Sequence, residues 1–231
     1  MSTQLLKTDD YALNLLSPSW SGPVVLYISN EHFGDAGEKI SSQLASANNS
    51  PFTMCELLVK DWDKYLTPWE AQANMQGRTF AGEAKVLLSH IKDEILPVIR
   101  DNAGDSKVYI AGYSLAGLFA LWSLYECGLF DGAACCSGSV WYPGWREYAS
   151  SHKVQKAACV YLSLGLKEKN TKHPLMKTVE DNMRYQYELL TKDEAAERVQ
   201  LDWNEGGHFS GTQERMVKGI SWLYNSYESA Y

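Results

Sequence analysis

The chain has no long apolar run and no cluster of basic residues, and each absence excludes a class of function. Its 231 residues include 21 Lys and Arg against 28 Asp and Glu, which gives a net charge of -7. Phosphates require clustered cations, so this balance excludes nucleic acid as a partner and disfavours anionic membranes. No segment is long enough to span a bilayer, and residues 1–20 lack the apolar core of a signal peptide.

Cysteine is also scarce. There are five cysteines, an odd number, and two of them are the neighbours Cys135 and Cys136, whose side chains would point to opposite faces of a strand. We therefore expect no disulfide framework and a cytoplasmic location. The cysteine spacing matches no zinc site, and nothing calls for a metal or an organic cofactor.

What the chain does contain is a regular alternation of short apolar and longer amphipathic segments. The apolar segments, predicted as strands, are residues 23–29, 52–59, 107–111, 132–137, 158–164 and 198–203. The amphipathic segments, predicted as helices, are residues 35–47, 79–102, 115–127, 176–192 and 213–227. Pro97 is expected to kink the last turn of the longest helix. The alternation predicts one α/β domain over residues 1–231, with a mostly parallel sheet, helices on both faces and function at the carboxyl ends of the strands.

One strand-to-helix junction has the layout of a nucleophile elbow. Residues 108–117 read Val-Tyr-Ile-Ala-Gly-Tyr-Ser-Leu-Ala-Gly, so that Ser114 follows an apolar strand and precedes a helix. Gly112 and Ala116 are small enough for the strand and the helix to approach each other. The N–H of Leu115, first in the helix, would face a negative charge beside Ser114. Because Ala116 replaces the last glycine of Gly-x-Ser-x-Gly, a glycine-rich turn with an incidental serine is the competing interpretation of this motif alone.

A nucleophilic serine needs a base, and the chain has five histidines. His208 is the one that follows the last predicted strand, where a preceding glycine pair would bring its imidazole to the carboxyl edge of the sheet. The order Ser, acid, His of the α/β-hydrolases is then available. His90 falls within the long helix and His152 in a polar loop, so neither is expected at the site. His32 and His173 lie in loops and are candidate binding residues.

Several short segments, spread over most of the chain, match one known family when they are taken together. They are residues 61–69, 80–82, 112–117, 137–143, 163–168 and 206–208. In these segments the chain resembles the esterase-like α/β-hydrolases, which include siderophore esterases of the enterobactin type, feruloyl esterases and small bacterial serine esterases. The resemblance implies an α/β-hydrolase core without a large lid domain.

The acid of the site is where the chain departs from this family. The resemblance implies an acid after the strand that ends near residues 163–165, and where relatives often carry Asp this chain has Leu166. A leucine cannot orient an imidazolium. Glu168, the carboxylate nearest to the strand end, is the first candidate. Asp181 is the second, because related acyltransferases take their acid from the start of the following helix, and a Ser–His dyad without a carboxylate is the third alternative.

The remaining parts of the predicted site are an oxyanion donor and a substrate pocket. The second oxyanion N–H should come from the loop at residues 29–33, which faces the elbow in this fold, and we assign it to Asn30. Several aromatic residues fall in or near predicted strand-end loops: Trp62, Trp69, Trp141, Tyr142 and Trp145. Among them Trp69, Trp141 and Tyr142 are the candidates to wall an apolar or aromatic acyl pocket, although such residues are as often core.

The sequence thus predicts a serine carboxylic ester hydrolase that acts on a small-molecule ester. Ser114 would attack the carbonyl and His208 would take its proton, with a carboxylate behind the imidazole. Arg78 and Arg146 are additional candidates, for a substrate carboxylate. Two alternatives remain: a serine acyltransferase or peptidase that uses the same site, and a hydrolase-fold binding module, which is suggested by Leu166.

Overall fold

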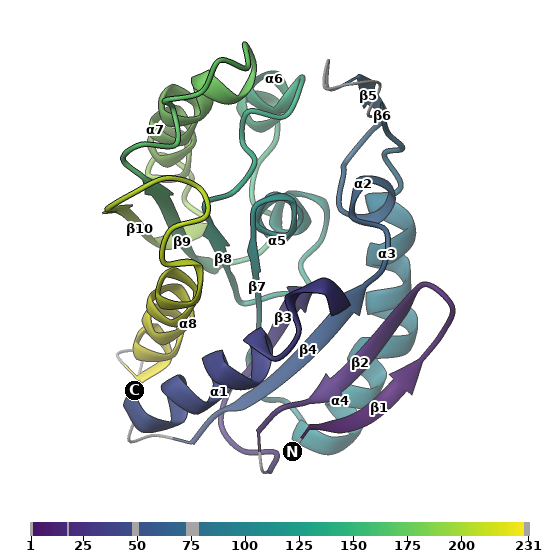
Figure 1. Cartoon of the computed structure of the whole chain (residues 1–231). Helices are drawn as coiled ribbons and strands as arrows, with labels where there is room; N and C mark the ends of the chain where they lie inside the picture. The colour runs from purple at the N-terminus through teal and green to yellow at the C-terminus, as the bar shows by residue number, and fades with distance from the viewer. Residues whose placement is uncertain (1, 18, 48–50, 73–78, 229–231) are drawn as a thin grey trace.

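An eight-stranded sheet forms the centre of the part of the chain that the computed structural model describes, residues 2–17, 19–47, 51–72 and 79–228 (Figure 1). The strands are β1 (Thr3–Lys7), β2 (Tyr11–Leu15), β3 (Val24–Ser29), β4 (Thr53–Val59), β7 (Val108–Tyr113), β8 (Gly132–Cys136), β9 (Ala158–Gly165) and β10 (Ala196–Asn204). Their spatial order is β1-β2-β4-β3-β7-β8-β9-β10. β2 is antiparallel to both of its neighbours, whereas all pairs from β4 to β10 are parallel. The predicted α/β fold with a mostly parallel sheet is therefore confirmed.

Helices cover both faces of the sheet (Figure 1). α1 (Ala36–Ala47) and α8 (Thr212–Glu228) pack on one face. On the other lie α3 (Ala84–His90), α4 (Leu96–Ala103), α5 (Leu115–Glu126) and α7 (Val179–Leu190), with the short α2 (Trp62–Tyr65) and α6 (Trp145–Ser151) beyond the strand ends. None of the helices in the described part of the chain combines the length and the apolar character that a bilayer crossing requires.

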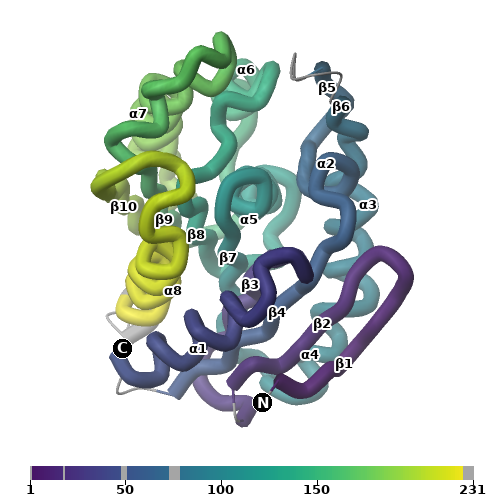
Figure 2. Tube along the Cα trace, in the orientation of Figure 1, coloured from purple at the N-terminus to yellow at the C-terminus, as the bar shows by residue number. Residues whose placement is uncertain are grey.

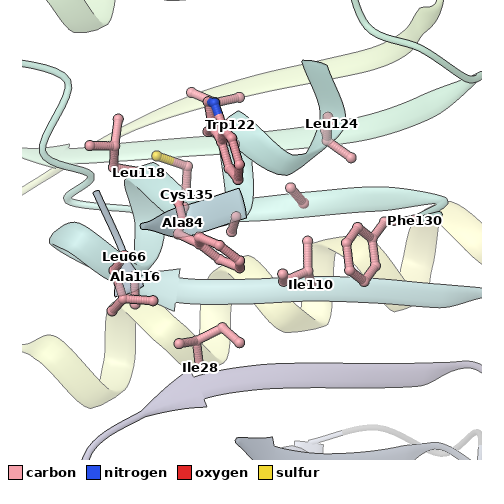
Figure 3. Packing of buried hydrophobic residues seen from close by; sticks show 14 of the residues in the cluster. Ile28, Leu66, Ala84, Ile110, Ala116, Leu118, Trp122, Leu124, Phe130 and Cys135 are labelled. Atoms are coloured by element: carbon pink, nitrogen blue, oxygen red, sulfur yellow. The ribbon is translucent and has the colours of Figure 1, made fainter. Parts of the chain in front are cut away.

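Each central strand contributes alternate side chains to two separate cores. In β3, Leu26 and Ile28 face the core beneath α5, whereas Tyr27 faces the core beneath α1 and α8. Figure 3 shows the first of these cores, in which Ile28 and Trp122 lie among the packed side chains. Cys135 and its neighbour on β8 likewise enter opposite cores, as predicted, and all five cysteines are free thiols.

The six predicted strands are present, but the sequence analysis missed the antiparallel pair β1 and β2. It also missed the two-stranded pairing of β5 (Ala71–Gln72) with β6 (Thr79–Phe80). The predicted helix at residues 79–102 is a second difference. Its first residues belong to β6, and a π-helical turn, Ile91–Ile95, separates α3 from α4. Pro97 lies in the first turn of α4, directly after the π-helical turn, and not in the last turn of the helical segment.

Candidate active site

Ser114 occupies a strained turn between β7 and α5. Its backbone has φ 59° and ψ -120°, and Ser114 and Ser137 are the two non-glycine residues with positive φ in the described part of the chain. Such a conformation costs about 1–3 kcal/mol and persists where its surroundings hold it. Here the N–H of Ser114 donates to the carbonyl of Cys136 at 3.1 Å, and its carbonyl accepts from the N–H of Ser139 at 3.0 Å. A Cβ at Gly112 would lie 2.4 Å from the carbonyl carbon of the helix residue opposite, so glycine is required there.

His208 reaches Ser114 from the loop that follows β10, and Figure 2 shows this yellow-green loop beside the start of α5. Its Nε2 lies 3.0 Å from Ser114 Oγ. The loop is tied to the elbow as well, because the hydroxyl of Tyr113 donates to the carbonyl of His208 at 2.7 Å. The structure therefore brings together a serine and a histidine that are 94 residues apart in sequence.

Glu168 stands behind this histidine. Its Oε2 lies 2.8 Å from His208 Nδ1, and its Oε1 accepts the N–H of Gly165 at 2.7 Å. Burial alone would raise the pKa of Glu168, but the hydrogen bond and charge of His208, together with the donors Gly165 N–H and Ser137 Oγ, hold it below its ordinary value. Asp181 lies exposed on α7, away from this group.

Leu166, at the position where the family resemblance led us to expect an acid, belongs to the turn after β9. Its side chain is 42% exposed, and its N–H donates to the carbonyl of Asn204. The tight turn after β9 instead brings Glu168 back toward the strand end, with its N–H on the carbonyl of Gly165. A carboxylate two residues farther along thus occupies the space next to His208.

Arg215 is a member of this group that the sequence analysis missed. It lies in the first turns of α8, is 2% exposed, and its Nη1 donates to Glu168 Oε1 at 2.8 Å. One signal could have found it. Arg215 shares the i, i+4, i+8 line of the helix with Gly219 and Leu223, which are buried, and a charged side chain on such a line requires a partner.

The two predicted oxyanion donors lie at the start of α5 and in the loop after β3. Leu115 is the first residue of α5, where backbone N–H groups lack helical partners. In the loop after β3, the Asn30 side chain donates to the carbonyls of Val59 and Lys60 and accepts the N–H of His32 at 2.9 Å. The side chain of Asn30 thus fixes the loop after β3, and the oxyanion role of its backbone N–H stays a prediction.

Two cavities of unequal size meet at Ser114 and His208. The smaller, about 160 Å³, is lined mainly by apolar side chains, among them Ile28, Ala36, Ile40 and Met216. The larger, about 540 Å³, is lined by Phe80, Trp141, Met176 and Val179 together with Ser139, Lys167, Asn170 and Thr171. Trp62 and Phe209 line both cavities, and Phe209 is 91% exposed.

The aromatic residues proposed for the pocket divide into two groups. Trp141 lines the larger cavity. Trp69 and Tyr142 are not among the described residues that line either cavity at Ser114, and they pack against each other with the Tyr142 hydroxyl donating to the carbonyl of Trp69. The Trp69 indole N–H donates to the carbonyl of Pro143. These hydrogen bonds connect the two loops, so the polar atoms of Trp69 and Tyr142 hold the loops together.

The other sequence candidates lie elsewhere. His90 is paired with a glutamate on its own helix, and His152 stacks on Tyr148. Neither His32 nor His173 is among the described residues that line the two cavities. The Arg146 guanidinium lies over the ring of Tyr185, and Arg78 falls outside the described residues.

Comparisons with known proteins identify a family and a fold for the chain. Residues 17–212 match the model of a family described as "Putative esterase". A sequence search of curated proteins gives no match.

Solved structures with the same fold have low sequence identity. The siderophore hydrolase EstA from Aspergillus nidulans is 17% identical, with a TM-score of 0.77 over 98% of this chain and 94% of its own. An IroE-like serine hydrolase from Shewanella oneidensis is 16% identical, with a TM-score of 0.78 over 98% and 80%. The enterobactin esterase FES from Shigella flexneri is 17% identical, with a TM-score of 0.68 over 100% and 60%.

Proposed function

Because the chain belongs to this esterase family through residues 17–212, we propose that it hydrolyses carboxylic esters through an acyl-enzyme on Ser114. His208 is the base, and Glu168 orients it. The observation that carries the proposal is the unbroken line of contacts, 3.0 Å from Ser114 Oγ to His208 Nε2 and 2.8 Å from His208 Nδ1 to Glu168 Oε2.

The first half of the reaction forms the acyl-enzyme. With Nδ1–H donated to Glu168, Nε2 of His208 carries a lone pair toward Ser114 Oγ. His208 takes the hydroxyl proton as Oγ adds to the ester carbonyl, and the imidazolium then gives this proton to the leaving alcohol. Water repeats the sequence in the second half, and the acid product leaves. The N–H of Leu115 and the N–H of Asn30 are the proposed donors to the oxyanion.

Glu168 suits the orienting role better than Asp181 for a geometric reason. An acid of this kind must contact the imidazole nitrogen that faces away from the serine, and Glu168 does so at 2.8 Å. Its lowered pKa keeps it ionised at neutral pH, so it stabilises the imidazolium that forms on His208. Asp181, exposed on α7, has no such contact.

The two cavities set the shape of the substrate. One side of the ester fits an apolar space of about 160 Å³, and the other a space of about 540 Å³ with aromatic walls and hydroxyl, amide and lysine groups at its edge. We propose a small-molecule ester that places an apolar or aromatic group against Trp141 and Phe80. The names of similar structures, a siderophore hydrolase and a ferulic acid esterase, agree with this class of substrate.

The decisive experiment combines labelling of the nucleophile with a panel of p-nitrophenyl esters of rising chain length. Labelling by a fluorophosphonate should be lost in Ser114→Ala, and hydrolysis should fall on the order of 10⁶-fold. His208→Ala should lose nearly as much, and the double variant little more, because the two groups act as a unit. His152→Ala, a surface histidine stacked on a tyrosine, is the matched control and should retain activity. A Ser114→Ala variant that keeps more than about a tenth of the turnover would refute the proposal.

A further inference from the structure

The most heavily bonded buried side chain near the site is Arg215. Its guanidinium lies 2.8–3.0 Å from five acceptors. Glu168 Oε1, Ser137 Oγ and Tyr113 OH share the two hydrogens of Nη1, and Nη2 donates to the carbonyls of Glu205 and Gly207. The side chain is 2% exposed, and the side chain of Glu168 is 4% exposed. A cation buried this deeply is costly unless its partners are complete, so the arrangement calls for an explanation beyond packing.

We propose that Arg215 is a positioning residue for ester hydrolysis. It holds the turn that carries Glu168 and the loop that carries His208 at a fixed distance from each other, and it keeps the Glu168 carboxylate ionised behind His208. The inference rests on the proposed function, since it assigns Arg215 a role in that reaction. It adds a residue of α8 that does not touch the reacting atoms and acts through Glu168.

The first argument is connectivity. Glu168 lies in the turn after β9, whereas Glu205 and Gly207 lie in the loop that carries His208. Arg215 bonds to all three, so one planar fork spans the two loops whose separation determines the distance from Nδ1 to the carboxylate. A third tie runs through Tyr113, which accepts from Arg215 and donates to the carbonyl of His208.

The second argument is the space reserved for the guanidinium. A Cβ at Gly165 would lie 2.7 Å from Arg215 Nη2 and 2.7 Å from the carbonyl oxygen of Gly206. Any side chain at the end of β9 would therefore displace the arginine or the His208 loop. Gly165 also donates its N–H to Glu168 Oε1, the same oxygen that accepts from Arg215. At the end of β9, the Gly165 N–H and the Arg215 guanidinium thus both donate to Glu168 Oε1, and Oε2 faces the imidazole.

The third argument is charge. The general-base role requires an uncharged His208 imidazole beside the buried Glu168 carboxylate, so the form of the pair that acts as base carries one negative charge until the imidazole takes up a proton during catalysis. Arg215 supplies a positive charge at every stage, because a guanidinium does not deprotonate in proteins. Among the described residues, the titratable neighbours of the pair and of Arg215 include the phenol of Tyr113, the thiol of Cys136, which donates to the Arg215 carbonyl, and Lys167, which lines the larger cavity. Arg215 itself contacts the carboxylate directly, at 2.8 Å.

Removal of this charge has a defined consequence. The Glu168–His208 pair would bind a proton more readily, whichever of the two groups receives it, and the protonated pair cannot serve as the base. The acid limb of the pH–rate profile should therefore move to higher pH, on the order of one pH unit or more for a charge in contact with the pair. Loss of packing alone would leave the limb in place.

The test compares Arg215→Met, Arg215→Lys and a control, Leu223→Ala, which removes buried packing from the same helix far from the site. For each, kcat, KM and the rate of fluorophosphonate labelling are measured from pH 5 to 9, together with the free energy of unfolding in urea. We expect Arg215→Met to lower kcat roughly 10–100-fold, by analogy with groups that orient metal ligands, at little change in KM. The acid limb of the pH–rate profile of Arg215→Met should move to higher pH for both hydrolysis and labelling. In Arg215→Lys the limb should return to its wild-type position.

The outcomes separate the inference from the function on which it rests. An Arg215→Met variant whose acid limb coincides with that of Leu223→Ala overturns the positioning role, even if both are less stable. An Arg215→Lys variant that folds but whose acid limb stays at higher pH also overturns the positioning role, because the lost positive charge would then not be what displaced the limb. If the wild-type protein itself is neither labelled nor active, the proposed function fails and the inference fails with it.

Discussion

Replacing Glu168 by glutamine tests the proposed acid of the site, whose carboxylate lies behind His208. The two carboxylate oxygens have different partners. Oε1 accepts from the Gly165 N–H and the Arg215 guanidinium, whereas Oε2 faces His208 Nδ1. A glutamine has one acceptor and one donor end. Its oxygen should take the Oε1 position, where two donors converge and one is charged, and its NH₂ should then face the imidazole.

This orientation determines the size of the effect. An NH₂ opposite Nδ1 makes Nδ1 the acceptor, so the proton moves to Nε2, which then points an N–H and not a lone pair at Ser114 Oγ. The wrong tautomer and the lost negative charge act together. In the Ser-His-Asp proteases the equivalent change lowers kcat about 10⁴-fold, which corresponds to about 5 kcal/mol of transition-state stabilisation. We expect the same order here for Glu168→Gln.

The assay is steady-state hydrolysis of a p-nitrophenyl ester at pH 7–8, with the unfolding midpoint in urea as a check on the fold. Asp181→Asn is the matched control, a carboxylate on the exposed side of α7, and should be close to wild type. Glu168→Gln within about tenfold of wild-type kcat would refute the reasoning, because the expected loss is about 10⁴-fold. A loss in Asp181→Asn together with an active Glu168→Gln would transfer the orienting role to Asp181.

Three further changes probe the chain around the site. Leu166→Asp should not raise kcat, because the side chain at 166 is 42% exposed and Glu168 already faces His208; a higher kcat in the same hydrolysis assay would contradict this. Gly112→Ala should destabilise the fold by about 1–3 kcal/mol in urea unfolding and lower kcat, since its Cβ would lie 2.4 Å from the carbonyl carbon of Ala116. Burial raises the pKa of Glu56, and its Oε1 accepts no hydrogen bond from any described residue. The folded protein therefore binds a proton at Glu56 more tightly than the unfolded chain does. This contribution to the free energy of unfolding is complete at low pH and is lost as the pH rises through the raised pKa. Glu56→Gln should therefore gain stability over wild type as pH increases, and a difference in unfolding free energy that is constant with pH would contradict that.

Local patterns were sufficient for the elements that position the site. The apolar runs of β3, β7, β8 and β9 are buried on both faces, so composition alone marks them as central parallel strands. The elbow was equally readable, because the small residues around Ser114 answer a steric need within a few positions of the chain. These features depend on neighbours in sequence, which is why they could be predicted.

The features that the sequence analysis did not foresee depend on contacts between distant segments. β1 is largely exposed at the edge of the sheet, so its residues carry little apolar signal. Trp69 and Tyr142 were predicted as pocket residues from their places in loops, yet they are not among the described residues at either cavity and bond to each other across 73 residues of sequence. Whether an aromatic side chain turns to a cavity or to a neighbouring loop is not encoded in its own segment.

The sequence by itself determined the alternation of strands and helices, the serine at the elbow and the histidine after the last strand, because backbone sterics and apolar periodicity act over short stretches of chain. Only the tertiary structure decided which carboxylate stands behind that histidine. The sequence left Glu168, Asp181 and a dyad as alternatives, and in the structure the turn after β9 and the guanidinium of Arg215 place Glu168 next to His208. A hydrogen bond requires alignment within a few tenths of an ångström between groups that are 40 and 47 residues apart here, and only the packed fold supplies that alignment.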